Sequence, residues 1–422
     1  MLDIKFIKEN PDLIREAARK KHVQFNVDDL LKVEGERAEA LNAFETARAE
    51  QNRISDQVAK ETDPAKRGIM IAELKPLKEE ITKKEEVLRE VMKTWRELML
   101  QVPNVPDISV PEGESDAENA EVRVWGERPQ FSFEPKDHST LMEERDLVDF
   151  VRGTKVAGFR GYFLKGDAML LQFALWNYFL SKIITKGFVP LGVPSLVAKS
   201  TLYGTGYLPQ GEEDLYKTQD DEYLAGTGEV AAMSYYADEV LQKNQFPIKF
   251  VAFSPCFRRE AGAHGKDVKG LVRVHEFFKL EQIVLCEAHH EQSVSFHEEI
   301  TNNVEEILQE LGLHYHVVAN CGGDLGLGQV KKYDIEVWMP SQQKFRETHS
   351  ASYFHDFQTR RLNIRYRDDD GKLKYVHSLN NTLVATPSRM IAAIIENYQQ
   401  VDGSIAVPEV LKPYIGKDFL GK

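Results

Sequence analysis

The chain has 422 residues, enough for two or three domains, and its 42% hydrophobic and 29% charged residues are typical of a globular protein. A formal net charge of −13 argues against indiscriminate nucleic-acid binding, which needs a basic surface, but leaves room for a local basic site. No apolar run is long enough to span a bilayer and residues 1–21 do not resemble a signal peptide, so we expect a cytoplasmic protein without membrane contact.

The first hundred residues predict helices. Residues 3–21 form a short helical segment, and Asp28 or Asp29 can cap the helix that follows. From there to about residue 100, apolar side chains recur at intervals of three and four, which is typical of a coiled-coil seam. The seam residues are Leu30, Val33, Leu41, Phe44, Ala47, Ile54 and Val58, then Leu74, Leu77, Ile81, Leu88, Val91, Trp95 and Leu98.

A turn divides this helical region into two halves. Residues 60–68, "KETDPAKRG", carry turn chemistry in Asp63, Pro64 and Gly68, so residues 1–102 predict a helical domain with an antiparallel coiled-coil hairpin. Pro76 predicts a kink or a late start of the second helix. A spacer, a dimerisation element and an RNA-binding arm all fit, because acidic and basic residues are nearly balanced here.

Residues 103–130 predict a linker, since they combine prolines with an acidic stretch and show no periodicity. Residues 131–422 alternate helical and strand-like segments, beginning with a long amphipathic helix over 168–185. The strand-like segments often lie in adjacent pairs, which favours an α+β domain with an antiparallel sheet flanked by helices. Neither common phosphate-binding loop is present, so a nucleotide would bind without one.

A basic segment at residues 254–282 joins two strand-like stretches through a glycine-containing loop. Its cations are Arg258, Arg259, Lys266, Lys269, Arg273 and Lys279. Strand alternation puts Arg258 and Glu260 on one side with Arg259 opposite. On the return strand one face carries Arg273, His275, Phe277, Lys279 and Glu281. Such a face offers arginine for phosphate, an aromatic ring for a base and carboxylates for amino groups. A solvated hairpin with cross-strand ion pairs fits the same residues.

This segment, "FRRE…GLVRVHEFFKLEQ", resembles motif 2 of the class II aminoacyl-tRNA synthetases, and in detail that of the seryl-tRNA synthetase family. "FVPLGVPSLV" resembles motif 1, with Pro194 as its proline, and "LNNTLVATPSRMIAAIIENYQ" resembles motif 3, with Arg389 as its arginine. "TGYLPQGEEDLYK" and "KFRETHSASYFHDFQTRR" resemble segments peculiar to the same family. The resemblance runs in order along almost the whole chain.

The resemblance implies a fold and an activity. The fold is a class II synthetase catalytic domain over 131–422 with the helical hairpin as a tRNA-binding arm, in a homodimer. The activity is ATP-dependent: L-serine is activated to seryl-adenylate with release of pyrophosphate, then transferred to the 3′ end of tRNA(Ser), with tRNA(Sec) as a further candidate. The serine carboxylate attacks the α-phosphorus itself, so such a site aligns reactants and neutralises charge.

The family's nucleotide site carries over residue by residue. Arg258 matches the arginine on the α-phosphate, Glu260 the contact to the adenine amino group, and Phe277 the ring under adenine. Arg389 covers the other face of adenine or reaches the γ-phosphate, and Glu347 and Ser350 match the Mg²⁺ ligands. Arg258, Arg389 and Glu347 are the implied catalytic residues. The implied ATP-binding residues are Arg258, Arg259, Glu260, Arg273, Val274, Phe277, Glu347, Thr348, His349, Ser350 and Arg389.

The serine site carries over in the same way. Its implied residues are Thr227, Gly228, Glu229, Arg258, Glu281, Asn380 and Thr382. Gly228 departs from the family, which usually has alanine there. Between Asn380 and Arg389 the chain takes nine steps where the family takes eight, which predicts a one-residue bulge near Pro387 and Ser388. The imidazole of His349 is expected to pack or support the site rather than act as a catalytic base.

Two other functions stay open at this level. A ligase that charges a carrier protein would be expected to lack the hairpin, and a non-catalytic RNA-binding paralogue would be expected to lose Arg258, Glu281 or Arg389. The family's zinc-dependent branch is disfavoured, because Cys256 and Cys286 lie in predicted strands without a matching ligand set.

Overall fold

The computed structural model describes residues 1–262, 267 and 269–421, and it contains two compact units. One comprises Met1–Arg19 and Val23–Pro103, and the other comprises Lys20–His22 and Asn104–Lys422. Among the described residues, none of the helices combines the length and the apolar character needed to cross a bilayer.

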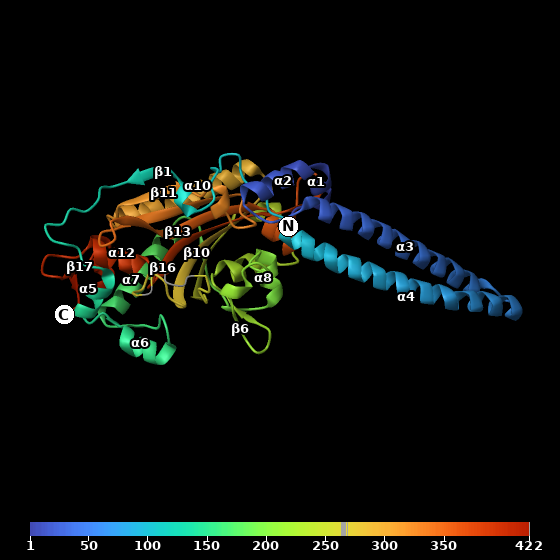
Figure 1. Cartoon of the computed structure of the whole chain (residues 1–422), viewed down its shortest axis with the longest axis horizontal. Helices are drawn as coiled ribbons and strands as arrows, with labels where there is room; N and C mark the ends of the chain where they lie inside the picture. The colour runs from blue at the N-terminus through green and yellow to red at the C-terminus, as the bar shows by residue number, and fades with distance from the viewer. Residues whose placement is uncertain (263–266, 268, 422) are drawn as a thin grey trace. The chain divides into compact units, whose positions relative to one another are not determined.

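The first unit is helical, as predicted. Two short helices, α1 (Ile4–Glu9) and α2 (Pro11–Lys20), precede two long ones, α3 (Val27–Lys60) and α4 (Pro64–Gln101). The long helices lie side by side as an antiparallel hairpin (Figure 1). The prediction that Asp28 or Asp29 caps the first long helix is wrong by two or three residues, because the Asn26 side chain accepts the hydrogen bond from the backbone N–H of Asp28 at 3.0 Å.

The turn between the long helices is tighter than predicted. The Asp63 carboxylate accepts from the backbone N–H of Ala65 at 2.9 Å, and Pro64 occupies the first helical position, where its missing N–H costs nothing. Helix α4 therefore starts at Pro64, includes Gly68 and continues through Pro76. The late start predicted from Pro76 is wrong.

Pairing along the hairpin follows the predicted seam. Leu30, Ala47 and Ile54 of α3 are buried, and the Arg37 guanidinium lies over the Trp95 ring of α4 at 5.2 Å from its centroid. Arg37 also pairs with Glu34 one turn earlier at 2.7 Å. Apolar contacts and a cation over an aromatic ring thus hold the two helices together.

The second unit is built on an eight-stranded sheet in the order β1–β11–β12–β13–β16–β10–β9–β4. Every neighbouring pair is antiparallel except β4 and β9. The antiparallel α+β prediction is confirmed. The strands are β1 (Ala120–Trp125), β4 (Val189–Gly192), β9 (Ile248–Phe257), β10 (Glu276–Cys286), β11 (Tyr315–Ala319), β12 (Lys331–Met339), β13 (Lys344–His355) and β16 (His377–Thr386).

Smaller elements surround this sheet. The remaining helices of four or more residues are α5 (His138–Glu144), α6 (Phe150–Ala157), α7 (Asp167–Ile184), α8 (Lys199–Thr205), α9 (Glu229–Met233), α10 (His290–Glu310), α11 (Phe357–Arg361), α12 (Met390–Asn397) and α13 (Lys412–Ile415). The small sheets comprise β2 (Val148–Asp149), β3 (Phe163–Leu164), β5 (Leu196–Val197), β6 (Tyr216–Lys217), β7 (Tyr223–Leu224), β8 (Val240–Gln242), β14 (Arg365–Arg367), β15 (Leu373–Tyr375), β17 (Ile405–Ala406) and β18 (Phe419–Leu420).

The predicted linker contains an edge strand. Residues 120–125 form β1, which pairs with β11, whereas the sequence predicts no regular structure over 103–130. Val122 and Val124 alternate with Glu121 and Arg123 as in a strand, but both valines are about half exposed, as expected at the edge of a sheet. Asn104, at the start of this segment, donates through its side-chain amide to the carbonyl oxygens of Gly328 and Phe354.

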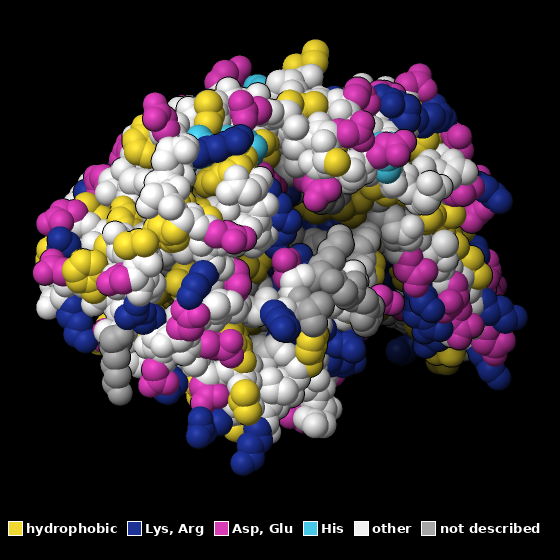
Figure 2. Space-filling model, turned by 60° about the vertical axis from the view of Figure 1, so that its left-hand side comes forward, with side chains coloured by type: hydrophobic (Ala, Val, Ile, Leu, Met, Phe, Trp, Pro, Cys, Tyr) yellow, Lys and Arg dark blue, Asp and Glu magenta, His cyan; other side chains and the backbone are white. Residues whose placement is uncertain are grey.

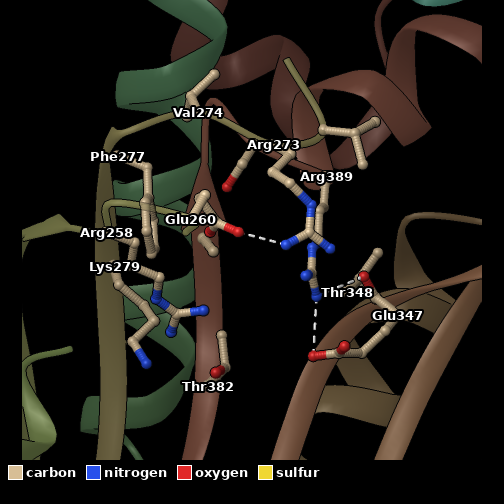
Figure 3. A pocket seen from close by; sticks show the side chains of 13 residues that line it. Arg258, Glu260, Arg273, Val274, Phe277, Lys279, Glu347, Thr348, Thr382 and Arg389 are labelled. Atoms are coloured by element: carbon tan, nitrogen blue, oxygen red, sulfur yellow. Dashed lines mark hydrogen bonds and ion pairs between the residues drawn. The ribbon is translucent and has the colours of Figure 1, made fainter. Parts of the chain in front are cut away.

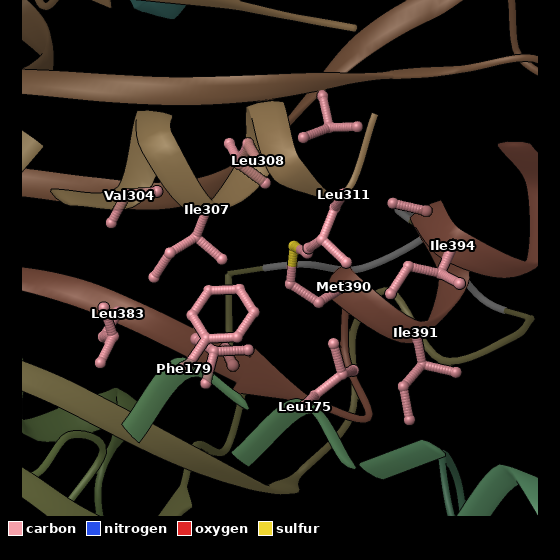
Figure 4. Close-up of a cluster of buried hydrophobic side chains, with 14 of the residues drawn as sticks. Leu175, Phe179, Val304, Ile307, Leu308, Leu311, Leu383, Met390, Ile391 and Ile394 are labelled. Carbon is pink, nitrogen blue, oxygen red and sulfur yellow. The ribbon is translucent and has the colours of Figure 1, made fainter. Parts of the chain in front are cut away.

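Helices α7, α10 and α12 cover one face of the sheet, and α9 and α11 pack against part of the other face, where the site lies. Side chains of α7, α10 and α12 meet in the cluster of Figure 4, which contains Phe179, Ile307, Leu308, Leu311, Leu383, Met390 and Ile391. The Gln282 and Asn381 amides both donate to the Ile300 carbonyl of α10. Because successive strand residues point to opposite faces, their neighbours Glu281 and Thr382 point away from α10.

A histidine between two carboxylates links three neighbouring strands at the edge of the sheet. His316 of β11 stacks on Phe345, with 3.8 Å between ring centroids. Its Nδ1 lies 2.9 Å from Glu121 of β1 and its Nε2 lies 2.8 Å from Glu336 of β12. Burial alone would lower the pKa of His316, but the two carboxylates outweigh it and raise the pKa above the ordinary value.

We therefore expect His316→Gln to destabilise the protein mainly at low pH. A raised pKa in the folded state contributes stability that is present below the unfolded value of about 6.5 and is lost as the pH rises through the folded value. Denaturant unfolding of the wild type and the variant over a pH series measures this difference. The matched variant is His289→Gln, because that ring is half exposed. Parallel stability curves for wild type and His316→Gln would contradict the prediction.

Candidate active site

A cavity opens on the face of the sheet opposite α10. It is lined by Arg258, Glu260, Val272, Arg273, Val274, Phe277, Lys279, Glu347, Thr348, Thr382, Ala385, Ser388 and Arg389 (Figure 3). A second cavity of about 590 Å³ adjoins it and shares Arg273, Glu347 and Arg389. Acidic and basic side chains are interspersed over the molecular face in Figure 2, and Lys and Arg side chains show in a hollow near its centre. The acidic excess of the chain therefore does not exclude an anion site.

The cavity collects residues from distant parts of the sequence. Of the nucleotide-site residues predicted by resemblance, eight line it: Arg258, Glu260, Arg273, Val274, Phe277, Glu347, Thr348 and Arg389. From the predicted serine site, Thr382 lines it together with Arg258. Lys266 of the basic segment lies outside the described residues.

One wall of the cavity combines a ring with two cations. Phe277 and Lys279 lie on β10, and Arg258 follows directly after the end of β9. The Arg258 guanidinium lies over the Phe277 ring at 5.3 Å from its centroid, and its Nε donates to the Gly226 carbonyl at 3.2 Å. Figure 3 shows Phe277, Arg258 and Lys279 side by side on this wall. A flat apolar surface next to a fixed guanidinium suits a base and its phosphate.

The opposite wall carries two charged pairs on strained backbone. Arg273 pairs with Glu260, and Arg389 Nη1 lies 2.8 Å from Glu347 Oε1 and donates to the Glu347 carbonyl at 3.0 Å. Glu260 has φ of 54° and Arg389 has φ of 60°, values that non-glycine residues rarely adopt. Strain of this kind persists only where the surroundings enforce it, and it concentrates at functional sites.

Electrostatics keep Glu347 ionised. Burial alone would raise the pKa of the Glu347 carboxyl, but the charges of Arg389 and Lys332 outweigh burial and lower it. The same pairing raises the pKa of Arg389. This wall therefore presents a carboxylate that can bind a cation beside a guanidinium that can bind a phosphate.

A β-bulge in β13 turns two consecutive residues toward the cavity. Ile335 of β12 pairs with His349 and the next residue, Glu336, pairs with Glu347, which leaves Thr348 as the extra residue. Glu347 and Thr348 consequently both line the cavity, whereas strict alternation would send one of them to the other face. Ser350 pairs with Asp334 across β12 and is not among the lining residues.

The nucleotide-site prediction for His349 is wrong. His349 is buried on the helix side of the sheet, where its ring stacks with Phe179 of α7 at 6.4 Å between centroids. Burial lowers the pKa of His349 to about 3, so the imidazole is neutral. It packs in the core, in agreement with the expectation that it is no catalytic base.

Arg259 also lies apart from the cavity. Its side chain is exposed, and its backbone N–H donates to the Asp214 carbonyl at 2.9 Å. The position agrees with strand alternation, which puts Arg259 opposite Arg258 and Glu260, and it contradicts the ATP-binding role implied by the resemblance.

His275 does not share the strand face predicted for it. Strand β10 starts at Glu276, so His275 precedes the strand, and it lines a different cavity with Phe159.

Strand β16 contains a β-bulge. Thr382 pairs with Glu281 and Val384 pairs with Leu280, which leaves Leu383 as the unpaired residue. Leu383 is buried in the helix-side core of Figure 4. Pro387 and Ser388 follow the end of β16, and the additional residue expected there relative to the family stays a prediction. Arg389 keeps its place in the cavity.

A buried carboxylate lies next to the cavity on β10. Glu281 is 2% exposed, and its Oε2 lies 2.6 Å from Lys279 Nζ. Burial raises the pKa of Glu281, the Lys279 charge opposes this, and the nearby Glu229 carboxylate adds to it. Thr382 faces Glu281 across the strand pair. Lys279 shares a strand face with Phe277 and Glu281, but the family resemblance implies no role for it.

The predicted serine loop is buried beside these groups. Thr227, Gly228 and Glu229 are all buried, and Glu229 begins helix α9. Tyr207 and Gln358 donate to the two oxygens of Glu229 at 2.8 and 2.6 Å. Neither Tyr207 nor Gln358 was predicted, because no short motif links them to Glu229. Asn380 is also buried. It pairs with Ile283, which lies two residues beyond Glu281 on β10, so Asn380 lies close to Glu281 in the sheet.

Comparison with known proteins agrees with this geometry. Residues 215–398 match the family model of the tRNA synthetase class II core domain (G, H, P, S and T), and residues 1–106 match that of the seryl-tRNA synthetase N-terminal domain. The chain is 45% identical to the serine–tRNA ligase of Deinococcus radiodurans and 43% identical to that of Thermodesulfovibrio yellowstonii. Both alignments cover 100% of this chain and at least 99% of the relative.

The chain belongs to the seryl-tRNA synthetase family. A solved structure agrees: the seryl-tRNA synthetase from Pyrococcus horikoshii complexed with ATP is 38% identical, with a TM-score of 0.89 over 100% of this chain and 99% of that one. The predicted family and fold are confirmed. A seryl-tRNA synthetase N-terminal domain disfavours the carrier-protein alternative, and the presence of Arg258, Glu281 and Arg389 disfavours a non-catalytic paralogue.

Within this seryl-tRNA synthetase fold, the residues present fit a magnesium ion that is shared with a bound phosphate chain. No group of three or more His, Cys, Asp or Glu within the described part of the chain is arranged to hold a metal. Mg²⁺ takes oxygen ligands and is often held by one or two carboxylates together with substrate phosphates. Glu347 supplies such a carboxylate from the cavity wall, whereas Ser350 as a second ligand stays a prediction.

A substitution at Gly228 can test how tightly the serine loop is packed. Its backbone, with φ −64° and ψ −18°, suits alanine, and an added Cβ would lie 3.0 Å from Ser254 Oγ and 3.4 Å from Ala252 Cβ. We expect Gly228→Ala to raise the free energy of unfolding by about 0.4–1 kcal/mol once that hydroxyl is absent. Denaturant unfolding of Ser254→Ala with and without Gly228→Ala measures this gain. A loss of stability in the Ser254→Ala background would show that Ala252, rather than the hydroxyl, limits the space.

Proposed function

We propose that the chain activates L-serine with ATP to form seryl-adenylate and pyrophosphate, and transfers serine to the 3′ end of tRNA(Ser). One observation carries this proposal: a chain similar over its full length to serine–tRNA ligases brings Arg258, Phe277, Glu347 and Arg389 to one cavity. The ATP complex of the Pyrococcus horikoshii relative supports ATP as the nucleotide.

The nucleotide half of the site binds ATP through charge and stacking. Phe277 supports the adenine ring, with Glu260 near its amino group, and Arg258 beside this ring holds the α-phosphate. Arg389 covers the far side of adenine or reaches the γ-phosphate. Glu347 and Ser350 would hold Mg²⁺, which supplies charge neutralisation to the phosphates when bound. Arg273 and Val274 complete the lining.

The serine half binds the amino acid through buried polar groups. Glu229 and Glu281 offer carboxylates to the serine ammonium and hydroxyl, while Thr227, Asn380 and Thr382 close the pocket. A serine carboxylate oxygen then forms a bond to the α-phosphorus as the bond between the α-phosphorus and the bridging oxygen of pyrophosphate breaks. No side-chain nucleophile is required, because alignment and charge neutralisation suffice.

The helical hairpin, within residues 1–102, is proposed to bind tRNA. Lys60, Lys66 and Arg67 lie exposed around the turn, where they can meet phosphates. Double-stranded RNA is recognised mostly through backbone and shape, so a nearly balanced overall charge does not prevent this role. The same recognition would extend to tRNA(Sec) if that tRNA presents the same backbone shape.

A cytoplasmic location is proposed as well. The three cysteines are free and buried, which is consistent with a reducing compartment.

A homodimer is proposed from an apolar surface on the second unit. Leu170 and Phe173 of α7 are more than two-fifths exposed, and Val189 of the edge strand β4 is more than half exposed. Phe173 packs against Trp176, whose ring lies 5.1 Å from Phe253. Exposed apolar side chains gathered around aromatic rings are typical of a protein interface. A second copy of the chain is the expected occupant.

The first experiment measures ATP–pyrophosphate exchange with serine, threonine, alanine and glycine, without tRNA. We expect exchange with serine, and rejection of alanine by up to about 10⁴-fold because its missing hydroxyl leaves buried polar groups unpaired. Arg258→Ala should abolish exchange. Arg259→Ala, which changes the adjacent exposed arginine, should leave it near the wild-type rate. Lack of exchange with all four amino acids would refute the enzyme proposal.

The dimer proposal has a separate test. Phe173→Asp puts a charge into the proposed interface, and burying an unpaired charge is costly, so we expect it to shift the protein to monomer in sedimentation experiments. Val401→Asp is the control, since Val401 is 77% exposed and lies outside this surface. A monomeric wild type, or a Phe173→Asp variant that stays dimeric, would contradict the proposal.

A further inference from the structure

Two donors from separate parts of the chain hold the Glu229 carboxylate. Tyr207 OH donates to Oε2 at 2.8 Å, and Gln358 Nε2 donates to Oε1 at 2.6 Å. Tyr207 follows helix α8, whereas Gln358 lies on α11. These donors, one on each oxygen, fix the plane of the carboxylate, and Asn380 also hydrogen-bonds to it. A carboxylate has about four acceptor sites, so one remains for a ligand.

Hydrogen bonds also fix the orientation of the Gln358 amide. Its Oε1 accepts from Ser378 Oγ at 2.9 Å, and its Nε2 donates to the Thr205 carbonyl at 3.2 Å as well as to Glu229. Gln358 and Ser378 are 0% exposed, so no solvent exchange relaxes this arrangement. Because the Thr205 carbonyl can only accept, it fixes which side of the amide carries nitrogen, and that nitrogen donates to Glu229.

Close packing of α8 against α11 keeps Gln358 within reach of Glu229. A Cβ added to Gly204 of α8 would lie 2.2 Å from Leu362 Cδ2, just beyond the end of α11. A larger residue at 204 would force the buried Leu362 side chain to move. Close packing of α8 beside the end of α11 therefore helps to hold Gln358 next to Glu229.

The charges around Glu229 are mixed. Burial raises the pKa of Glu229, and the hydrogen bonds from Gln358 and Tyr207, followed by the Lys279 charge, oppose that rise. Glu281 is a second nearby carboxylate, and Arg258 is the other cation that acts on this group of side chains. Removing a donor from Glu229 would leave burial and the Glu281 charge less opposed.

We propose that Gln358 is a positioning residue for serine: it orients the Glu229 carboxylate and favours its ionised form, so that the remaining lone pair accepts the serine ammonium. The inference rests on the proposed function, in which Glu229 contacts serine. Gln358 acts only through Glu229 and contacts neither reacting atom. Tyr207 performs the same task at the second oxygen.

The test uses the full chain and serine-dependent ATP–pyrophosphate exchange as a function of pH. Gln358→Met removes the donor while keeping the length of the side chain. The KM for serine should rise between about tenfold and a hundredfold, the range expected for losing a hydrogen bond to a charged group, while the KM for ATP stays unchanged. The acid limb of kcat/KM for serine should move to higher pH, because protonated Glu229 cannot accept the ammonium.

Gln282→Met provides a matched control. Gln282 is also a buried glutamine with two hydrogen bonds, to Ile300 and Asn303, and it points to the helix side of the sheet. Loss of the Gln282 amide should lower the free energy of unfolding without moving the pH profile of kcat/KM for serine. Tyr207→Phe, which keeps the ring, is a second variant in case Gln358→Met folds poorly, and it should shift the acid limb in the same direction.

The outcomes separate this inference from the proposed function. Wild-type protein without serine-dependent exchange would overturn both. An active wild type whose Gln358→Met and Tyr207→Phe variants keep the acid limb in place, or raise the KM for ATP as much as that for serine, would overturn the positioning role alone. A shift confined to the two donor variants would support it.

Discussion

The burial of helix α12 is the constraint on which the nucleotide half of the site depends. Every residue from Met390 to Glu396 is buried, and the helix packs against α5, α7 and the sheet strands β12 and β16. Its side chains Met390, Ile391 and Ile394 join the cluster of Figure 4. Its cap, Arg389, adopts φ of 60°, a conformation that costs of order 1–3 kcal/mol for a residue other than glycine. The core contacts of the helix offset this cost. Core packing on one face of the sheet thus sets the direction of a guanidinium on the other.

Two bulges adapt a regular sheet to the same purpose. At Thr348 the bulge lets two consecutive residues, Glu347 and Thr348, line the cavity, and at Leu383 a bulge places an apolar side chain in the helix-side core. Because strand residues alternate between faces, each one-residue insertion changes which residues downstream reach the site. The register of three central strands therefore determines the chemistry of the open face.

Sequence reasoning predicted what local patterns encode. The coiled-coil hairpin follows from apolar spacing, and most of the nucleotide site follows from family motifs whose residues are close in the chain, such as Arg258 with Glu260. Features that depend on tertiary register were not predicted, namely the Leu383 bulge and the burial of His349 on the helix side of the sheet. Gln358 was missed for a related reason, because its partner Glu229 is more than a hundred residues away.

The two halves of the site differ in burial, and this difference assigns them different tasks. Around Glu347 the charged groups are partly open to solvent, with side-chain exposures of 39% for Glu347 and 25% for Arg389. A highly charged ligand can therefore bind there and leave again, because water solvates the charged side chains when the ligand is absent. Around Glu229 and Glu281 the carboxylates are almost fully buried and depend on fixed donors. A ligand that fails to complete those hydrogen bonds incurs a desolvation cost that water cannot relieve. Discrimination among small amino acids therefore belongs to the buried half, and tolerance of a large anionic nucleotide belongs to the open half.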